Sequence, residues 1–176
     1  MTDFISSTIS YNTDKKNTTN ETIIVNQNEI VSDTLTKYKK PFNSDLPTIG
    51  LLMCNGVLQS EVIATSDVFS KPSEQGKQLF NVVSIAETKN AISTEEGMHF
   101  VPDYTFDNCP KLNALIVPSA YDNYAQVHNE KIVDFIKNKN EETTYTVSNC
   151  ARAQLIGKSG IADGYKIVTW IGGGTQ

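Results

Sequence analysis

The distribution of hydrophobic positions divides the chain near residue 46. Residues 1–45 are rich in Ser, Thr, Asn, Asp and Lys, and they contain one apolar island, Ile23-Ile24-Val25, which is a candidate edge strand. A segment with so few apolar residues cannot bury enough surface to offset the entropy of ordering it. We therefore expect residues 1–45 to form a polar, disordered N-terminal extension and residues 46–176 to form the folded domain.

After residue 46, strand patterns alternate with helix patterns. Short apolar runs rich in β-branched residues predict buried strands, and apolar residues at helical spacing predict amphipathic helices. Residues 91–101 resemble a small hairpin with its turn at Glu95-Glu96-Gly97. The predicted strands are 48–54, 80–86, 112–117, 143–149 and 166–171, and the predicted helices are 59–69, 132–138 and a segment after Cys150. This order predicts an α/β fold with a mostly parallel sheet.

Composition limits the size and the partners of the domain. The chain has 176 residues, of which 39% are hydrophobic and 20% charged, which is enough for one core. A net charge of −5 argues against a nucleic-acid partner, because phosphate contacts need clustered Lys and Arg. The one basic cluster, Lys37-Tyr38-Lys39-Lys40, is short and lies in a linker-like region.

Targeting signals and cysteine usage indicate the compartment. No apolar run approaches the roughly 18–20 residues of a membrane span, and no basic segment followed by a hydrophobic stretch opens the chain. The three cysteines, Cys54, Cys109 and Cys150, are an odd number without close pairing, which suits reduced thiols. We expect a cytoplasmic protein with no membrane partner.

Cys150 is the strongest candidate for chemistry. It stands where the strand-like run 143–149 gives way to the helix-like run 151–157, the arrangement of a nucleophile elbow. The start of the helix directs free N–H groups and the positive end of its dipole at the sulfur, which favours the thiolate, the nucleophilic and oxidisable form. A buried cysteine that acts as a small hydrophobic residue is the alternative, and Cys54 and Cys109 are weaker candidates because no helix start follows them.

The motifs along residues 47–170 resemble those of the ThiJ/PfpI superfamily, relatives of the class I glutamine amidotransferases. The resemblance is closest to the isonitrile-hydratase-like branch and implies a flavodoxin-like three-layer α/β/α sandwich. Besides the cysteine elbow, the segments that carry it are Asn55-Gly56-Val57, Glu61, Ser66-Asp67-Val68-Phe69, Val101-Pro102-Asp103-Tyr104-Thr105-Phe106, Leu115-Ile116-Val117-Pro118 and Ser159-Gly160-Ile161-Ala162-Asp163-Gly164.

The resemblance also implies roles for individual residues. Cys150 takes the place of the nucleophile, and Glu61 takes that of the acidic residue that leans over the sulfur and moves protons. Ser119 and Ala120 replace a glycine-rich turn that supplies an N–H group to an oxyanion hole, and a second N–H would come from Ala151. Without the resemblance, Glu61 would be interpreted as an exposed helix carboxylate.

Three features depart from the family pattern. Trp170 stands where many relatives carry a histidine, and neither His99 nor His128 is an obvious replacement, so a Cys-His dyad is not expected. Arg152, two positions after the cysteine, replaces a small residue. It either points out of the turn and helps to hold an anion or ionise the thiol, or it marks an elbow that has lost catalysis.

The third departure is the end of the chain. Relatives continue past the last predicted strand, whereas this sequence stops after Gly172-Gly173-Gly174-Thr175-Gln176. The sequence is therefore interpreted as a fragment, a truncated gene product or one piece completed by another chain. Because an incomplete sheet exposes apolar surface and an unpaired edge, we expect a homo-oligomer or completion by another chain.

Two functions follow from the resemblance. The first is a hydratase or lyase that uses Cys150 and Glu61, without a cofactor or metal, on a small electrophilic molecule such as an isonitrile or an α-oxoaldehyde. The second is a non-catalytic redox-sensing or stress-response binding module of the same superfamily. Retention of Cys150 and Glu61 favours the first, and Arg152, Trp170 and the short C-terminus favour the second.

Overall fold

The computed structural model describes residues 40–120 and 122–170. From Phe42 onward these residues belong to one compact unit, Phe42–Gln176. The predictions for the N-terminal island and for the glycine-rich end lie outside the described residues. The predicted domain boundary after residue 45 stays a prediction.

A five-stranded sheet forms the centre of this unit, and every neighbouring pair of strands in it is parallel, as predicted. β1 lies in the middle and is buried along its whole length, as its mostly apolar sequence predicts. In spatial order the strands are β5 (Tyr104–Thr105), β2 (Asn81–Ala86), β1 (Thr48–Leu52), β6 (Ala114–Val117) and β7 (Tyr145–Ser148).

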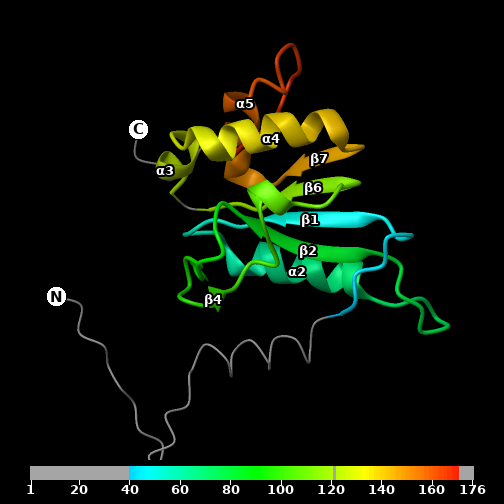
Figure 1. The fold of residues 1–176 in the computed structure, drawn as a ribbon. Helices are drawn as coiled ribbons and strands as arrows, with labels where there is room; N and C mark the ends of the chain where they lie inside the picture. Colours follow the sequence, from blue (N-terminus) through cyan, green and yellow to red (C-terminus); the bar gives the residue numbers. More distant parts are fainter. Residues whose placement is uncertain (1–39, 121, 171–176) are drawn as a thin grey trace, which may run out of the picture. The chain divides into compact units, whose positions relative to one another are not determined.

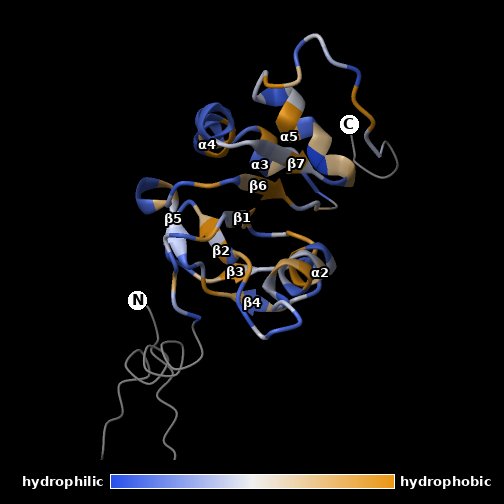
Figure 2. Ribbon diagram, turned by 90° about the vertical axis from the view of Figure 1, so that its right-hand side faces the viewer, coloured by the Kyte–Doolittle hydropathy of each residue, from blue (hydrophilic) through white to orange (hydrophobic). Residues whose placement is uncertain are grey.

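Helices cover both faces of the sheet and complete a three-layer α/β fold (Figure 1). Alternate side chains of β1 enter different cores: Leu51 packs with Val62 of α2, whereas Leu52 packs in the cluster that includes Phe135 of α4. The helices are α2 (Gln59–Ser70), α3 (Tyr124–Val127), α4 (Glu130–Glu142) and α5 (Ala153–Lys158). Figure 2 shows hydrophobic colouring on β2 and β6, and mostly hydrophilic colouring on α4.

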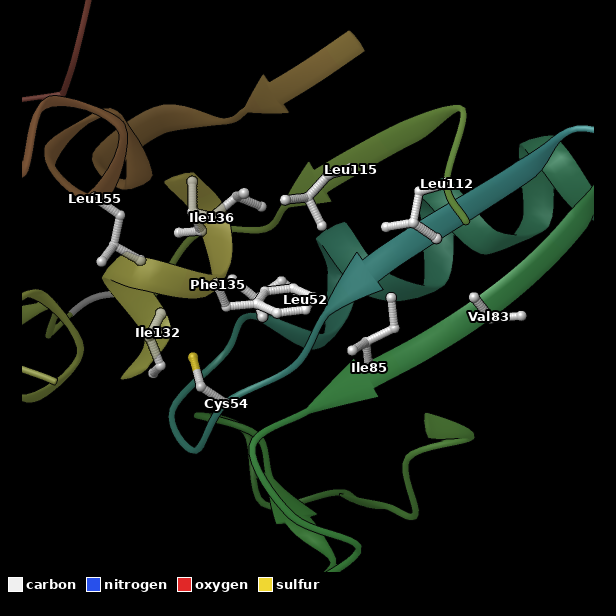
Figure 3. Packing of buried hydrophobic residues seen from close by; sticks show 11 residues of the cluster. Leu52, Cys54, Val83, Ile85, Leu112, Leu115, Ile132, Phe135, Ile136 and Leu155 are labelled. Carbon is white, nitrogen blue, oxygen red and sulfur yellow. The ribbon is translucent and has the colours of Figure 1, made fainter. Parts of the chain in front are cut away.

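The larger core lies between the sheet and α4. Ile132, Phe135 and Ile136 are buried at the spacing of one helical face and contact side chains from β1, β2 and β6 (Figure 3). Asn129 caps the start of α4, because its side chain accepts a hydrogen bond from the N–H of Lys131 at 3.0 Å. The amphipathic pattern in the sequence therefore predicted this helix correctly, although α4 extends beyond the expected end at residue 138.

Three smaller elements differ in how well the sequence predicted them. The hairpin is present as the antiparallel pair β3 (Ile92–Ser93) and β4 (His99–Phe100). The two-residue strand β5 was not expected. The predicted strand at 166–171 is wrong for its described part, because residues 166–170 form no ladder with any described strand. An apolar run becomes a strand only where a neighbouring strand accepts its backbone hydrogen bonds.

Candidate functional site

The site lies where the carboxyl ends of β1, β6 and β7 meet. In the register of β6 and β7, Val117 is opposite Ser148, so the residues that follow each strand are neighbours. The N–H of Asn149 donates to the carbonyl of Val117 at 3.3 Å and extends this contact past the last strand residues. In open α/β sheets this edge is the usual place for ligands and chemistry.

Cys150 has the backbone geometry of an elbow. Its φ is 52°, and it is the one non-glycine residue with positive φ among the described residues. The left-handed conformation costs an L-residue roughly 1–2 kcal/mol, so the surrounding structure must hold it in place. The chain then forms a 3-10 turn, Cys150–Arg152, before α5 begins at Ala153. The cysteine is exposed, which excludes the buried-hydrophobe alternative.

Glu61 is part of the same strand-end region. It lies in the first turn of α2, is half-buried, and its Oε2 accepts a hydrogen bond of 2.5 Å from the backbone N–H of Ser119. The start of α2 is tied to the same loop a second time, because the N–H of Leu58 donates to the carbonyl of Ser119 at 2.8 Å. The structure therefore does not support Glu61 as a freely exposed helix carboxylate.

The loop that follows β6 is closely packed. Ser119 and Ala120 are buried, and Ala120 forms an isolated antiparallel bridge with Val57. Neither residue needs the conformational freedom of glycine, because neither has a positive φ. The N–H of Ser119 faces Glu61, so an oxyanion would have to compete with this carboxylate for the donor. Ala151 is buried and lies directly after Cys150.

Arg152 points into the protein, which rules out the alternative in which its side chain points out of the turn. Only 1% of the residue is exposed. Its Nε donates to the carbonyl of Pro118 at 2.8 Å, and its Nη2 donates to the Sγ of Cys54, also at 2.8 Å. These acceptors lie after β6 and β1, so the side chain is drawn inward across the strand ends.

Burial shapes the ionisation of this pair. Burial lowers the pKa of the Arg152 guanidinium, and the proximity of Cys54 and Glu61 opposes that effect. Burial also raises the pKa of the Cys54 thiol, although Arg152 counteracts it. Cys54 is therefore a protonated, enclosed thiol, whereas Cys150 is the exposed one.

Two buried amides next to the elbow were missed by the sequence analysis. Asn123 donates through Nδ2 to the carbonyl of Ala151 at 3.2 Å, and Gln126 donates through Nε2 to the carbonyl of Asn55 at 2.8 Å. The Oδ1 of Asn123 and the Oε1 of Gln126 are buried without a hydrogen-bond partner. The only signal in the sequence was two amides three residues apart, a spacing that is common on exposed helices.

The histidines lie on other elements. His99 is on β4, and its Nδ1 lies 2.9 Å from the Oγ of Ser93. His128 follows α3 and stacks on Tyr124, with ring centroids 4.2 Å apart. Among residues 40–120 and 122–170, no group of three or more His, Cys, Asp and Glu side chains is placed to hold a metal ion. Within the same ranges, no helix has the length and hydrophobicity needed to cross a membrane.

Comparisons with known proteins agree with this fold. A ThiJ/PfpI family protein from Pseudomonas syringae has a TM-score of 0.61 at 20% identity, over 74% of this chain and 57% of that one. A protein from Anabaena variabilis with DJ-1/ThiJ/PfpI-like and ferritin-like domains has a TM-score of 0.60 at 17% identity, over 71% of this chain and 35% of that one.

A curated relative, isonitrile hydratase from Pseudomonas putida, is 26% identical over 78 residues. The match covers 44% of this chain and 34% of the relative, so the chain spans about a third of that protein. The DJ-1/PfpI family matches residues 47–174, most of the chain and all of the site described above. The chain belongs to the DJ-1/PfpI family.

Proposed function

We propose that the site adds water to a small electrophilic carbon, with Cys150 as the nucleophile and Glu61 as the group that moves protons. The observation that supports the proposal is the hydrogen bond between Glu61 and Ser119, because it ties the carboxyl to the loop after β6, and β6 pairs with β7, the strand that leads to Cys150. The exposure of Cys150 leaves its sulfur accessible to a substrate. The likeness to isonitrile hydratase makes isonitriles the first substrate class to test, followed by α-oxoaldehydes.

For an isonitrile, the proposed steps conserve all atoms and need no cofactor. The carboxylate of Glu61 takes the proton of the Cys150 thiol, the resulting thiolate attacks the terminal carbon and forms a C–S bond, and Glu61 passes the proton to that same carbon, which gives a thioimidate. Water then adds to this carbon, and Glu61 moves one proton of the water to the substrate nitrogen. Collapse of this intermediate breaks the C–S bond, returns the hydroxyl proton to the sulfur and leaves an N-substituted formamide, the substrate plus one water.

The direct test is turnover of a small alkyl isonitrile, followed by formamide formation with mass spectrometry. Cys150→Ser and Glu61→Gln should each abolish turnover, and product made in water labelled with oxygen-18 should carry one labelled atom. Cys109→Ser is the matched control, because it removes a thiol that lies outside the site. Unchanged turnover in Cys150→Ser or in Glu61→Gln would remove that residue from the mechanism.

The second candidate is a binding module in which Cys150 senses oxidants. It is favoured by Arg152, because the buried guanidinium fills a place that small residues take in catalytic elbows. Peroxide treatment followed by mass spectrometry separates the two functions. A sensor should form a sulfenic acid at Cys150 that a thiol reductant reverses, in a protein without isonitrile turnover.

Assembly and location are part of the same proposal. β7 is an edge strand of the described sheet, and Tyr145 and Val147 on it are exposed, as are Tyr165 and Val168 beyond α5. We expect this surface to be covered by a second copy or by another chain. Light scattering should give a mass above one chain, and a monomer that stays soluble would contradict the homo-oligomer. Cell fractionation tests the expected cytoplasmic location.

A further inference from the structure

Arg152 and Glu61 bind opposite ends of one peptide group. The carbonyl of Pro118 accepts from Nε of Arg152, and the N–H of the next residue, Ser119, donates to Glu61. The C=O and N–H bonds of a trans peptide lie in one plane and point in opposite directions. A rotation of this peptide would therefore break both hydrogen bonds at once.

We propose that Arg152 is a positioning residue, whose guanidinium orients the Pro118–Ser119 peptide so that the Ser119 N–H holds Glu61 beside the cysteine elbow. The inference rests on the proposed function for its catalytic meaning, although the orientation of the peptide is measurable without turnover. Under this proposal, Arg152 supports the site and is not a sign of lost activity.

Burial makes the arrangement effective. Arg152 and Ser119 are each 1% exposed, so water cannot replace either hydrogen bond readily. Hydrogen bonds to charged groups are stronger than neutral ones, and in a region of low dielectric a donor left unpaired is costly. The positive guanidinium and the negative carboxylate also attract each other, which polarises the peptide between them.

The sequence position of Arg152 couples this peptide to the nucleophile. Cys150 begins the 3-10 turn that Arg152 ends, so a movement of the Arg152 backbone also moves the backbone of Cys150. Its second contact, to the Sγ of Cys54, adds the end of β1 to the same clamp. The planar fork of an arginine suits two such separate acceptors, because its donors point in fixed and different directions.

The test uses two variants and one core control. Arg152→Met keeps most of the side-chain volume and removes all donors, whereas Arg152→Lys keeps the charge and loses the fork. Ile136→Val removes one methylene from the core cluster without changing a donor or acceptor of the Arg152 and Glu61 hydrogen bonds, and it controls for a general loss of stability. Each protein is assayed for isonitrile turnover and by ¹⁵N–¹H NMR, with the Ser119 amide as the reporter.

In the wild type we expect the Ser119 amide proton to resonate downfield and to exchange slowly, because its acceptor is a carboxylate and Ser119 is buried. Arg152→Met should move this resonance upfield, and Arg152→Lys should move it in the same direction by less. kcat should fall roughly 10- to 100-fold in Arg152→Met with KM changed less than about twofold, because a small misplacement of catalytic groups costs about this much. Ile136→Val should leave the Ser119 resonance unchanged.

An unchanged Ser119 resonance in whichever Arg152 variant folds would overturn the proposal. A wild type without isonitrile turnover, in which the Ser119 resonance still responds to Arg152, would refute the proposed function and support the positioning role. Equal effects of Ile136→Val and Arg152→Met on the Ser119 resonance would overturn the positioning role, since a loss of stability alone would then explain them.

Discussion

Gly50 is a residue at which the structure predicts the cost of a single methyl group. It lies in the middle of β1, and a Cβ built there would be 2.7 Å from Cδ1 of Ile85 and 2.8 Å from Cδ1 of Leu112. These side chains are 0% and 1% exposed, so neither can move aside into solvent. Gly50→Ala therefore overfills the core at the strand that leads to the site.

The expected change in the free energy of unfolding is the cost of overpacking minus the gain from a less flexible unfolded chain. Overpacking a core costs about 1–3 kcal/mol. Replacing glycine by alanine at a compatible φ stabilises a protein by about 0.4–1 kcal/mol, because it reduces the freedom of the unfolded chain. We therefore expect Gly50→Ala to lower the free energy of unfolding by about 1–2 kcal/mol.

Gly157→Ala is the matched control. Gly157 lies in α5, it is exposed, and a Cβ built there meets no atom within 4 Å. Alanine is a better helix former than glycine, so this variant should gain up to about 1 kcal/mol. Urea unfolding of both variants measures the two free energies. The packing argument would be refuted if Gly50→Ala were as stable as the wild type, or if Gly157→Ala had a lower free energy of unfolding than Gly50→Ala.

Three further predictions concern ionisation and packing. Burial raises the pKa of Cys109 from 9.0 to about 11, so at about pH 8 the alkylation of this thiol should be roughly 100-fold slower in the folded protein than in urea. Equal alkylation rates in the folded protein and in urea would contradict the shift. The folded state should also lose stability as the pH rises from about 9 to 11, because the unfolded chain releases the thiol proton first. The hydrogen bond from Lys131 lowers the pKa of Glu87, so Glu87→Gln should cost less than about 1 kcal/mol at about pH 7, and this cost should shrink as the pH falls and the carboxyl becomes protonated in the folded protein; urea unfolding across this pH range measures the change, and a cost that does not fall with pH would contradict it. Leu115→Ala removes a fully buried side chain and should cost about 3–5 kcal/mol, whereas Val168→Ala, at a residue that is 95% exposed, should stay within about 0.5 kcal/mol; similar losses in chemical denaturation would be inconsistent with this assignment of the core.

The fold was predictable where local patterns and tertiary burial agree. The apolar run of β1 and the helical spacing of Ile132, Phe135 and Ile136 specify elements that the structure contains. The two residues of β5 carry too short a pattern to be recognised. The apolar residues at 166–170 have a strand composition but no neighbouring strand among the described residues, and composition alone cannot supply one.

The backbone turn of the candidate site was predictable from the sequence, whereas the contacts around this turn were not. The strand-to-helix transition at Cys150 identified the elbow, because the turn is encoded by residues next to each other in the sequence. The direction of the Arg152 side chain depends on Cys54, 98 residues away, and on the carbonyl of Pro118, which no local pattern reveals. The occupation of the Ser119 N–H by Glu61 is likewise a long-range contact.

The most direct test of the central claim is competition among the three thiols. The protein is treated with less than one equivalent of iodoacetamide at about pH 7 and digested, and the label on each cysteine is quantified by mass spectrometry. We predict that Cys150 carries most of the label, because it is exposed whereas Cys54 is buried and Cys109 half-buried, and that Glu61→Gln changes the rate at Cys150 alone. Preferential labelling of Cys54 or Cys109, or a Cys150 rate that does not respond to Glu61→Gln, would contradict a reactive centre built from Cys150 and Glu61.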